Sequence, residues 1–221
     1  MFDEFIKANQ EKLDKITSFM LEYNKKVNLT RIVEKEEIIE KHYIDSMLPL
    51  TLYNVPRGTI VLDIGSGAGF PGIPMKLHRP DLSVTLLDSS RKRTDYLRQL
   101  LNEIEVDCDV ITARSEELAH DKSQRETYGL VVARAVANLA SLCEYCLPFV
   151  KVGGVFFAMK GEKSEVTPAE KAMRLLGGEV AEVIDYTLPS GDKRNLVVIK
   201  KIRECSTVYP RRRVNITKNP L

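Results

Sequence analysis

Apolar residues within the first 55 positions recur at the spacing of amphipathic helices. Leu13, Ile16, Phe19, Met20 and Tyr23 stand three or four residues apart, which gathers them on one helix face. A second helical pattern runs through EEIIEKHYIDSMLPL and is interrupted by Pro49. No glycine precedes the turn cluster NVPRG at 54–58. We therefore predict an N-terminal helical extension over residues 1–55.

From position 59 onward, short apolar runs alternate with helical patterns. Such alternation is typical of right-handed βαβ units, which build a parallel sheet with helices on both faces. The stretch LPSGDKR predicts a hairpin before the last strand, which would then be antiparallel. The fold class is therefore α/β, with a mostly parallel, doubly wound sheet of seven strands. We predict strands over 59–64, 83–88, 109–112, 130–133, 155–160, 179–188 and 195–201, and helices near 72–78, 91–103, 139–149 and 168–176.

The net charge of the 221-residue chain is only +2 but is unevenly distributed. Residues 200–221 hold seven basic residues and one acid, which leaves −4 on the rest of the chain. A basic tail on an acidic body suits a polyanion such as nucleic acid, although a solvated terminus is the plain alternative. We predict three parts: the helical extension at 1–55, one domain at 56–203 and a basic C-terminal tail at 204–221.

Localisation and redox state are expected to be those of a cytoplasmic protein. No apolar run approaches the ~20 residues of a membrane span. The first 15 residues carry four acids, unlike a secretory leader. Cysteines without a leader indicate free thiols. The pair Cys143 and Cys146 has too few neighbouring ligands for zinc, so we expect two buried small side chains and no metal.

Four glycines, Gly65, Gly67, Gly69 and Gly72, lie within eight residues directly after the first predicted strand. A glycine-rich turn between a strand and a helix lets the backbone approach a nucleotide closely. A dinucleotide is one candidate ligand, because 67, 69 and 72 satisfy the spacing of its fingerprint. That frame begins three residues past the strand, however, and contains a proline.

Two acids favour S-adenosylmethionine as the ligand over a dinucleotide. Asp63 stands two residues before Gly65, where it would attract the ammonium group of a cationic amino acid rather than a pyrophosphate. Asp88 ends the second predicted strand and is placed to accept hydrogen bonds from ribose hydroxyls. Asp88 would serve either ligand, so the preference depends on Asp63 and on the lack of a second domain for a dehydrogenase substrate.

The segments VLDIGSGAGFPGIP and VTLLDSSRKRTDYL make the chain similar to one known family. They resemble the bacterial small-subunit ribosomal RNA methyltransferases once called glucose-inhibited division protein B (RsmG). The resemblance covers nearly the whole chain, and GFPGIP is its most specific element. It implies a class I S-adenosylmethionine-dependent, Rossmann-like fold. The cofactor contacts that it implies fall on Gly65, Phe70, Ser115, Glu116 and Arg134.

The resemblance also implies the reaction: methyl transfer to N7 of one guanine in the helix-18 loop of 16S rRNA. The partner would be 16S rRNA, the small ribosomal subunit or its assembly intermediate, and the enzyme is expected to be a monomer. The residues agree with this chemistry. At the end of the fourth predicted strand and just after it, the chain reads VARAV at 132–136, which lacks the Asn/Asp-Pro-Pro-aromatic run of amine methyltransferases. Guanine N7 carries its own lone pair and needs no general base.

Five residues are candidates for substrate-side roles. We assign Arg134 to the cofactor carboxylate or to an RNA phosphate, with a structural ion pair as the alternative. His42 and Asp45, three apart on one helix face, are expected to pair structurally or to form a wall of the guanine pocket rather than to transfer protons. Asn28 is expected at the same pocket. Lys160, at the end of the fifth strand, is expected to contact a phosphate.

Two other functions stay open at this point. One keeps the cofactor but methylates a small molecule, against which the basic tail speaks. The other is a cofactor-sensing module that binds RNA without catalysis, which would not need acids at both ends of the cofactor.

Overall fold

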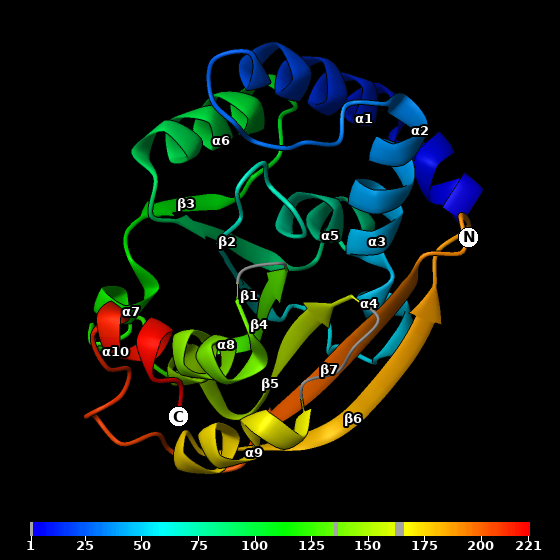
Figure 1. Ribbon diagram of the computed structural model, residues 1–221. Coiled ribbons are helices and arrows are strands. Elements are labelled where there is room, and N and C mark those ends of the chain that lie inside the picture. The colour runs from blue at the N-terminus through cyan, green and yellow to red at the C-terminus, as the bar shows by residue number, and fades with distance from the viewer. Residues whose placement is uncertain (1, 135–136, 162–165) are drawn as a thin grey trace.

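A seven-stranded sheet organises the protein (Figure 1), in the order β3-β2-β1-β4-β5-β7-β6. The computed structural model describes residues 2–134, 137–161 and 166–221. Strands β1 to β5 are parallel, and β7 is antiparallel to both β5 and β6. The predicted doubly wound fold and its final hairpin are confirmed. The order in which strands are added to the sheet reverses between β1 and β4: β2 and β3 lie on one side of β1, and β4 and β5 lie on the other. In such sheets ligands bind at the carboxyl ends of the strands at this switch point.

The strands agree closely with the hydrophobic pattern. β5 begins five residues before its predicted start because Val150 already pairs with Tyr128 of β4, ahead of a register shift. Residues 135 and 136, at the end of the VARAV motif, lie outside the described residues. The strands are β1 Ile60–Ile64, β2 Ser83–Asp88, β3 Asp109–Thr112, β4 Tyr128–Arg134, β5 Val150–Lys160, β6 Gly178–Thr187 and β7 Lys193–Lys201.

Side-chain alternation along the strands builds two apolar cores, one on each face of the sheet. Val61 of β1 packs into the core beneath α5, α6 and the N-terminal extension, whereas Leu62 packs into the core beneath α8 and α9. The helices α5 and α6 match their predicted bounds, whereas the short α7 and α10 were not predicted. The helices of the domain are α5 Gly72–His78, α6 Arg91–Glu103, α7 Ser115–Leu118, α8 Leu139–Cys146 with the 3-10 turn η2 Leu147–Phe149, α9 Val166–Leu175 and α10 Arg213–Lys218.

The N-terminal extension is helical, as predicted, and shares a core with the sheet. Helix α1, Phe2–Asn24, buries Leu13, Ile16 and Met20. Asn24 ends it, because its side-chain oxygen accepts the N–H groups of Leu29 and Thr30 at 2.8 and 3.1 Å. A second helical segment then runs through α2 Lys35–Ile38, the π-helix η1 Ile39–Ile44, α3 Asp45–Met47 and α4 Pro49–Leu52.

Pro49 interrupts this segment less than predicted. It is the first residue of α4, a position where the missing N–H costs no helical hydrogen bond.

The C-terminal segment 204–221 folds against the domain rather than extending from it. Ile216 is fully buried, and Arg211 forms an ion pair of 2.7 Å with the buried carboxylate of Glu144. Lys201, which belongs to the same basic stretch, is also buried and pairs with Glu126 at 3.0 Å. Two of the seven basic charges predicted to face a polyanion are thus neutralised inside the protein.

The thiols of Cys143 and Cys146 are fully buried in the core beneath α8, and burial raises the pKa of both. Across the described parts of the chain, none of the helices is long and apolar enough to span a lipid bilayer.

Candidate active site

The loop between β1 and α5 has the backbone conformation that its glycines permit. Gly65, Gly67 and Gly69 have φ angles of 77°, 57° and 96°, a region that other residues enter at a cost. The N–H of Gly65 donates to the carbonyl of Leu87 at 2.8 Å, and that of Gly67 donates to Asp88 Oδ2 at 3.1 Å. The glycine loop is therefore fastened to the end of β2.

Asp88 is the last residue of β2, and its contact with ribose stays a prediction. Its side chain is buried and its Oδ1 accepts the N–H of Ser90 at 2.8 Å. It lines a cavity at the carboxyl ends of β1 and β2, which we call the glycine-loop cavity, together with Gly65, Ser115 and Glu116. The structure thus brings four of the predicted cofactor residues together.

The carboxylate of Asp63 is not among the residues that line the glycine-loop cavity, and its contact with the ammonium group of the ligand stays a prediction. Asp63 points to the face of the sheet that α5 covers, where Oδ2 accepts the N–H of Gly72 at 2.9 Å. Burial raises the pKa of Asp63 to about 7, and Oδ1 is buried with no hydrogen-bond partner among the described residues. Asp63 therefore anchors the start of α5. The face of the sheet to which its side chain points is set by the alternation of side chains along β1, which the spacing between Asp63 and Gly65 does not report.

Gly72 is required for this anchor. A Cβ there would clash with Leu86 Cδ2 and would lie 2.8 Å from Asp63 Oδ2. We expect Gly72→Ala to lower the free energy of unfolding by about 1–3 kcal/mol, measured by urea denaturation. Gly161→Ala is the matched control, because no atom of the described residues, chain neighbours aside, lies within 4 Å of its added Cβ, and an equal loss in both variants would contradict the steric argument.

The other wall of the glycine-loop cavity contains residues that the sequence did not point to. Tyr145 comes from α8, and Arg213 and Thr217 come from α10, beyond the predicted domain. No spacing in the sequence links these residues to the glycine loop, since only the folding of the C-terminal segment brings them there.

S-adenosylmethionine fits the glycine-loop cavity by the chemistry of its lining. Asp88 presents carboxylate oxygens for ribose hydroxyls, and the side chains of Ile64, Leu87 and Ala113 provide apolar surface for an adenine ring. Gly65 presents backbone without a side chain, which admits a ligand close to the loop.

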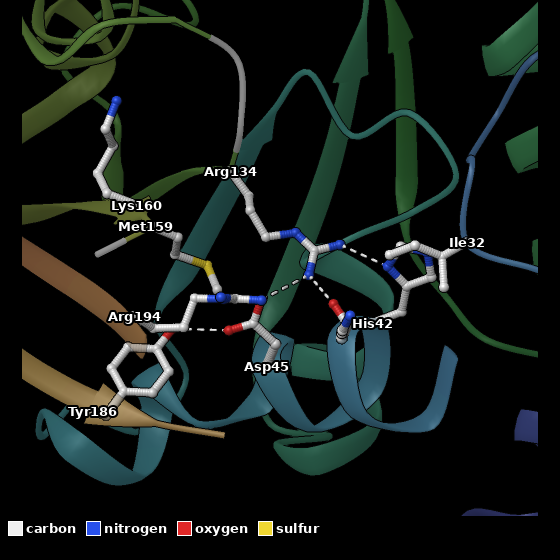
Figure 2. Close-up of a pocket in the computed structure, with 10 residues that line it drawn as sticks. Ile32, His42, Asp45, Arg134, Met159, Lys160, Tyr186 and Arg194 are labelled. Carbon is white, nitrogen blue, oxygen red and sulfur yellow. Dashed lines mark hydrogen bonds and ion pairs between the residues drawn. The ribbon is translucent and has the colours of Figure 1, made fainter. Parts of the chain in front are cut away.

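A second cavity, here called the Arg134 cavity, lies at the carboxyl ends of β4 and β5 (Figure 2). The second helical segment forms one wall of it and the β6–β7 hairpin another. Its lining comprises Ile32, Lys41, His42, Asp45, Arg134, Met159, Lys160, Gly161, Tyr186 and Arg194.

Arg134 joins the end of β4 to the second helical segment. Its Nη1 donates to the carbonyl of Lys41 at 2.8 Å and to Asp45 Oδ2 at 3.3 Å, and its Nη2 donates to His42 Nδ1 at 3.2 Å. The guanidinium carbon also lies 5.6 Å from the ring centre of Phe70, a cation–π distance. In this arrangement the predicted structural ion pair of Arg134 is present, and its guanidinium faces the Arg134 cavity.

Asp45 is held by donors from three separate elements. Besides Arg134, Tyr186 of β6 donates to Oδ1 at 2.9 Å and Arg194 of β7 donates to Oδ2 at 3.4 Å. Burial, followed by the charge of Asp45, raises the pKa of Tyr186, so its phenol keeps the proton that it donates. Asp45 is therefore an acceptor with its oxygens engaged.

His42 links the Arg134 cavity to the glycine loop. Its ring stacks on Phe70 with centroids 4.4 Å apart and planes 9° apart. Because a guanidinium only donates, His42 Nδ1 must be the acceptor, and the proton sits on Nε2, which donates to Thr30 Oγ1 at 3.0 Å. Burial and the charge of Arg134 lower the pKa of His42 to about 3, so the ring is neutral near pH 7.

This low pKa predicts an acid-sensitive contribution of His42 to stability. The unfolded pKa is about 6.5, so the folded protein favours the neutral ring. The contribution is fully present above pH 6.5 and is lost as pH falls toward 3, by up to about 1.4 kcal/mol per pH unit. Urea denaturation between pH 7 and pH 4 should show a steeper loss for the wild type than for His42→Asn. Parallel profiles would contradict the assignment.

Two predicted pocket residues have other surroundings. Asn28 is exposed and does not line the Arg134 cavity; its carbonyl accepts from Arg93 at 3.5 Å, and Ile32 of the same loop lines the cavity instead. Lys160 lines the cavity, but its side chain extends away from Arg134 (Figure 2) and its Nζ donates to the carbonyl of Ala137 at 2.9 Å.

Tyr186 and Arg194 are site residues that sequence reasoning missed. They are cross-strand partners in the β6–β7 hairpin, so they share one face of the sheet. The predicted hairpin was the available signal, because its register pairs them, but nothing in the sequence indicated that this face meets Asp45.

The strand order, the glycine loop and the buried Asp88 define a class I S-adenosylmethionine-dependent methyltransferase. Solved structures share this fold. The chain superimposes with a TM-score of 0.58 on M. jannaschii TYW2 in complex with AdoMet, at 14% identity over 78% of this chain and 80% of that one. It superimposes equally, with a TM-score of 0.58, on a putative methyltransferase from Bacillus halodurans, at 12% identity over 72% of this chain and 100% of that one.

Comparisons of sequence identify one family among the proteins that share this fold. The model of the GidB family, described as rRNA small subunit methyltransferase G, matches residues 9–200. A ribosomal RNA small subunit methyltransferase G from Acetivibrio thermocellus is 45% identical over 98% of this chain and 91% of its own length. One from Clostridium novyi is 49% identical over 90% of this chain and 84% of its own. The chain belongs to this family, and its cofactor is S-adenosylmethionine.

Proposed function

We propose that this enzyme methylates N7 of one guanine in the helix-18 loop of 16S rRNA. The observation that carries the proposal is the Arg134 cavity, which adjoins the glycine loop through the stacked pair Phe70 and His42. A base bound in that cavity would lie beside the methyl end of a cofactor held at Asp88 and Gly65. The names of the relatives, which specify small-subunit rRNA, support the same substrate.

The hydrogen bonds of the Arg134 cavity suit a nucleophile that needs no base. S-adenosylmethionine supplies a methyl group on a sulfonium, and guanine N7 offers an in-plane lone pair and loses no proton on attack. The oxygens of Asp45 accept from three donors, and His42 Nδ1 accepts from Arg134. Neither group is set up to remove a proton, and the task left to these residues is positioning.

The lining of the Arg134 cavity also suits a flat base taken out of its stack. Ile32 and Met159 give it apolar surface, and Tyr186 adds an aromatic ring. Unstacking a base costs a few kcal/mol, which contacts to flanking phosphates would offset. We assign one such contact to Lys160 at the rim, so binding should weaken as salt rises.

Family membership weighs against the two other functions. A cofactor-sensing RNA-binding module without catalysis is disfavoured because the family consists of methyltransferases. A small-molecule substrate is disfavoured because the family description specifies rRNA.

The experiment is methylation mapping of 16S rRNA from cells lacking this gene. Borohydride and aniline treatment cleaves RNA at N7-methylguanine, so the wild-type chain should restore one cleavage in the helix-18 loop. Asp88→Ala should not restore it. Restoration of a methyl group elsewhere, or of none, would refute the proposed substrate.

A further inference from the structure

The C-terminal segment 204–221 forms part of the wall of the glycine-loop cavity. Arg213 and Thr217, four residues apart on one face of α10, line this cavity. The match to the family model ends at residue 200, so α10 lies outside the matched residues. Figure 1 shows α10 beside α7 and α8, away from the N-terminal extension.

A buried ion pair holds the segment where it enters α10. The carboxylate of Glu144 on α8 is fully buried, and Oε1 accepts the backbone N–H of Arg211 at 2.7 Å. The guanidinium of Arg211 donates to both oxygens, from Nε at 2.9 Å and from Nη2 at 2.7 Å. Such bidentate pairs fix orientation as well as distance.

Further contacts hold the segment on both sides of Arg211. Arg125 donates to the carbonyls of Cys205 and Tyr209 at 2.8 and 2.9 Å. The side chain of Ile216 is fully buried, and its carbonyl accepts from Ser141 of α8 at 3.1 Å. These contacts fix the side of α10 that carries Ile216 against the domain, and they thereby hold Arg213 and Thr217 at the cavity.

The chemistry of this wall suits the adenosine end of the cofactor. Ser115 and Glu116, which follow β3, line the same cavity as Arg213 and Thr217, and Tyr145 of α8 lines it too. A guanidinium packs well on the face of an aromatic base, and a threonine hydroxyl can accept a hydrogen bond from an amino group.

We infer that α10 completes the adenosine subsite, with Arg213 and Thr217 forming the wall against which the adenosine of S-adenosylmethionine packs. The C-terminal segment then serves the cofactor directly, in addition to any contact of its exposed charges with RNA. This inference depends on the cofactor cavity and not on which base is methylated.

The test is calorimetric titration of the full-length protein, without RNA, with S-adenosylhomocysteine and with 5′-methylthioadenosine. The second ligand keeps the adenosine and lacks the amino acid part. We expect the double variant Arg213→Ala/Thr217→Val to raise the Kd of both ligands by about ten- to a hundredfold. Lys218→Ala removes a positive charge from the same helix, outside the cavity lining, and should change either Kd by less than about twofold.

An unchanged Kd in the double variant would overturn the inference, as would an equal rise in Lys218→Ala. The thermal midpoint of each variant is compared with the wild type. Should the double variant be destabilised, Arg213→Lys replaces it, because lysine keeps the charge and stem but loses the planar guanidinium; a Kd equal to that of the wild type would again overturn the inference. Because the titrations contain no RNA, a wrong substrate assignment would leave their outcome untouched.

Discussion

Replacing Arg134 with alanine is expected to lower the rate of methyl transfer to 16S rRNA by about a hundredfold or more. The guanidinium ties the end of β4 to Lys41, His42 and Asp45, so its loss frees the wall of the Arg134 cavity to move. A displacement of about 1 Å at a reacting centre costs on the order of a hundredfold in rate. Single-turnover transfer at saturating RNA and cofactor measures this effect.

The same variant should be less stable and still bind the cofactor. Removing one partner of a buried ion pair costs about 3–5 kcal/mol, and we expect the lower end because Arg194 and Tyr186 still contact Asp45. Arg134→Lys keeps the charge but cannot reach three acceptors, so it should recover stability more than rate. A loss of cofactor affinity as large as the loss of rate would instead assign Arg134 to the cofactor carboxylate.

The fold was predictable because each of its signals is local. The short apolar runs TIVLDI and SVTLLD, and the period of 3.6 in RKRTDYLRQLLNE, report which residues must be buried within one element. The helix α10 was not predicted because RVNITK is short and buries only Ile216. Its position depends on Arg211, just before the helix, and on the contact of Arg211 with Glu144, which stands 67 residues before Arg211.

The site was predictable only where the chemistry is tied to a strand end. Gly65 and Asp88 follow their strands directly, so the topology brings them together. Asp45 and Tyr186 are 141 residues apart, and their contact depends on how the extension packs against the hairpin. Asp63 is a different case: its position in the sequence suggests a ligand contact, which stays a prediction, and strand alternation turns its carboxylate toward Gly72.

The two cavities share one mechanical link, which gives Phe70 and His42 a role that neither motif suggested. Phe70 belongs to the glycine loop, and His42 belongs to the π-helix η1 of the extension. π-helical turns occur often at functional sites, and here the carbonyl of Lys41 in that turn accepts from Arg134. A shift of the glycine loop would therefore move Phe70, and through His42 it would displace the residues that line the Arg134 cavity.

Asp88→Ala is expected to weaken S-adenosylmethionine binding by at least about a hundredfold. Each hydrogen bond from a ribose hydroxyl to a carboxylate contributes about 1.5–3 kcal/mol, and the variant would lose two such bonds. It would also lose the acceptors that hold the N–H groups of Gly67 and Ser90, so the glycine loop itself would loosen. Calorimetric titration with S-adenosylhomocysteine measures the change.

The matched control is Asp95→Ala on the neighbouring helix α6. Asp95 pairs with Arg98 at 3.3 Å and does not line the glycine-loop cavity, so its removal should leave the Kd within about twofold of the wild type. Asp88→Asn should fall between the two, because an amide keeps one acceptor oxygen but loses the charge that strengthens both hydrogen bonds. If Asp88→Ala and Asp95→Ala had the same small effect, the ribose would have to bind elsewhere, and the glycine-loop cavity would no longer account for the cofactor.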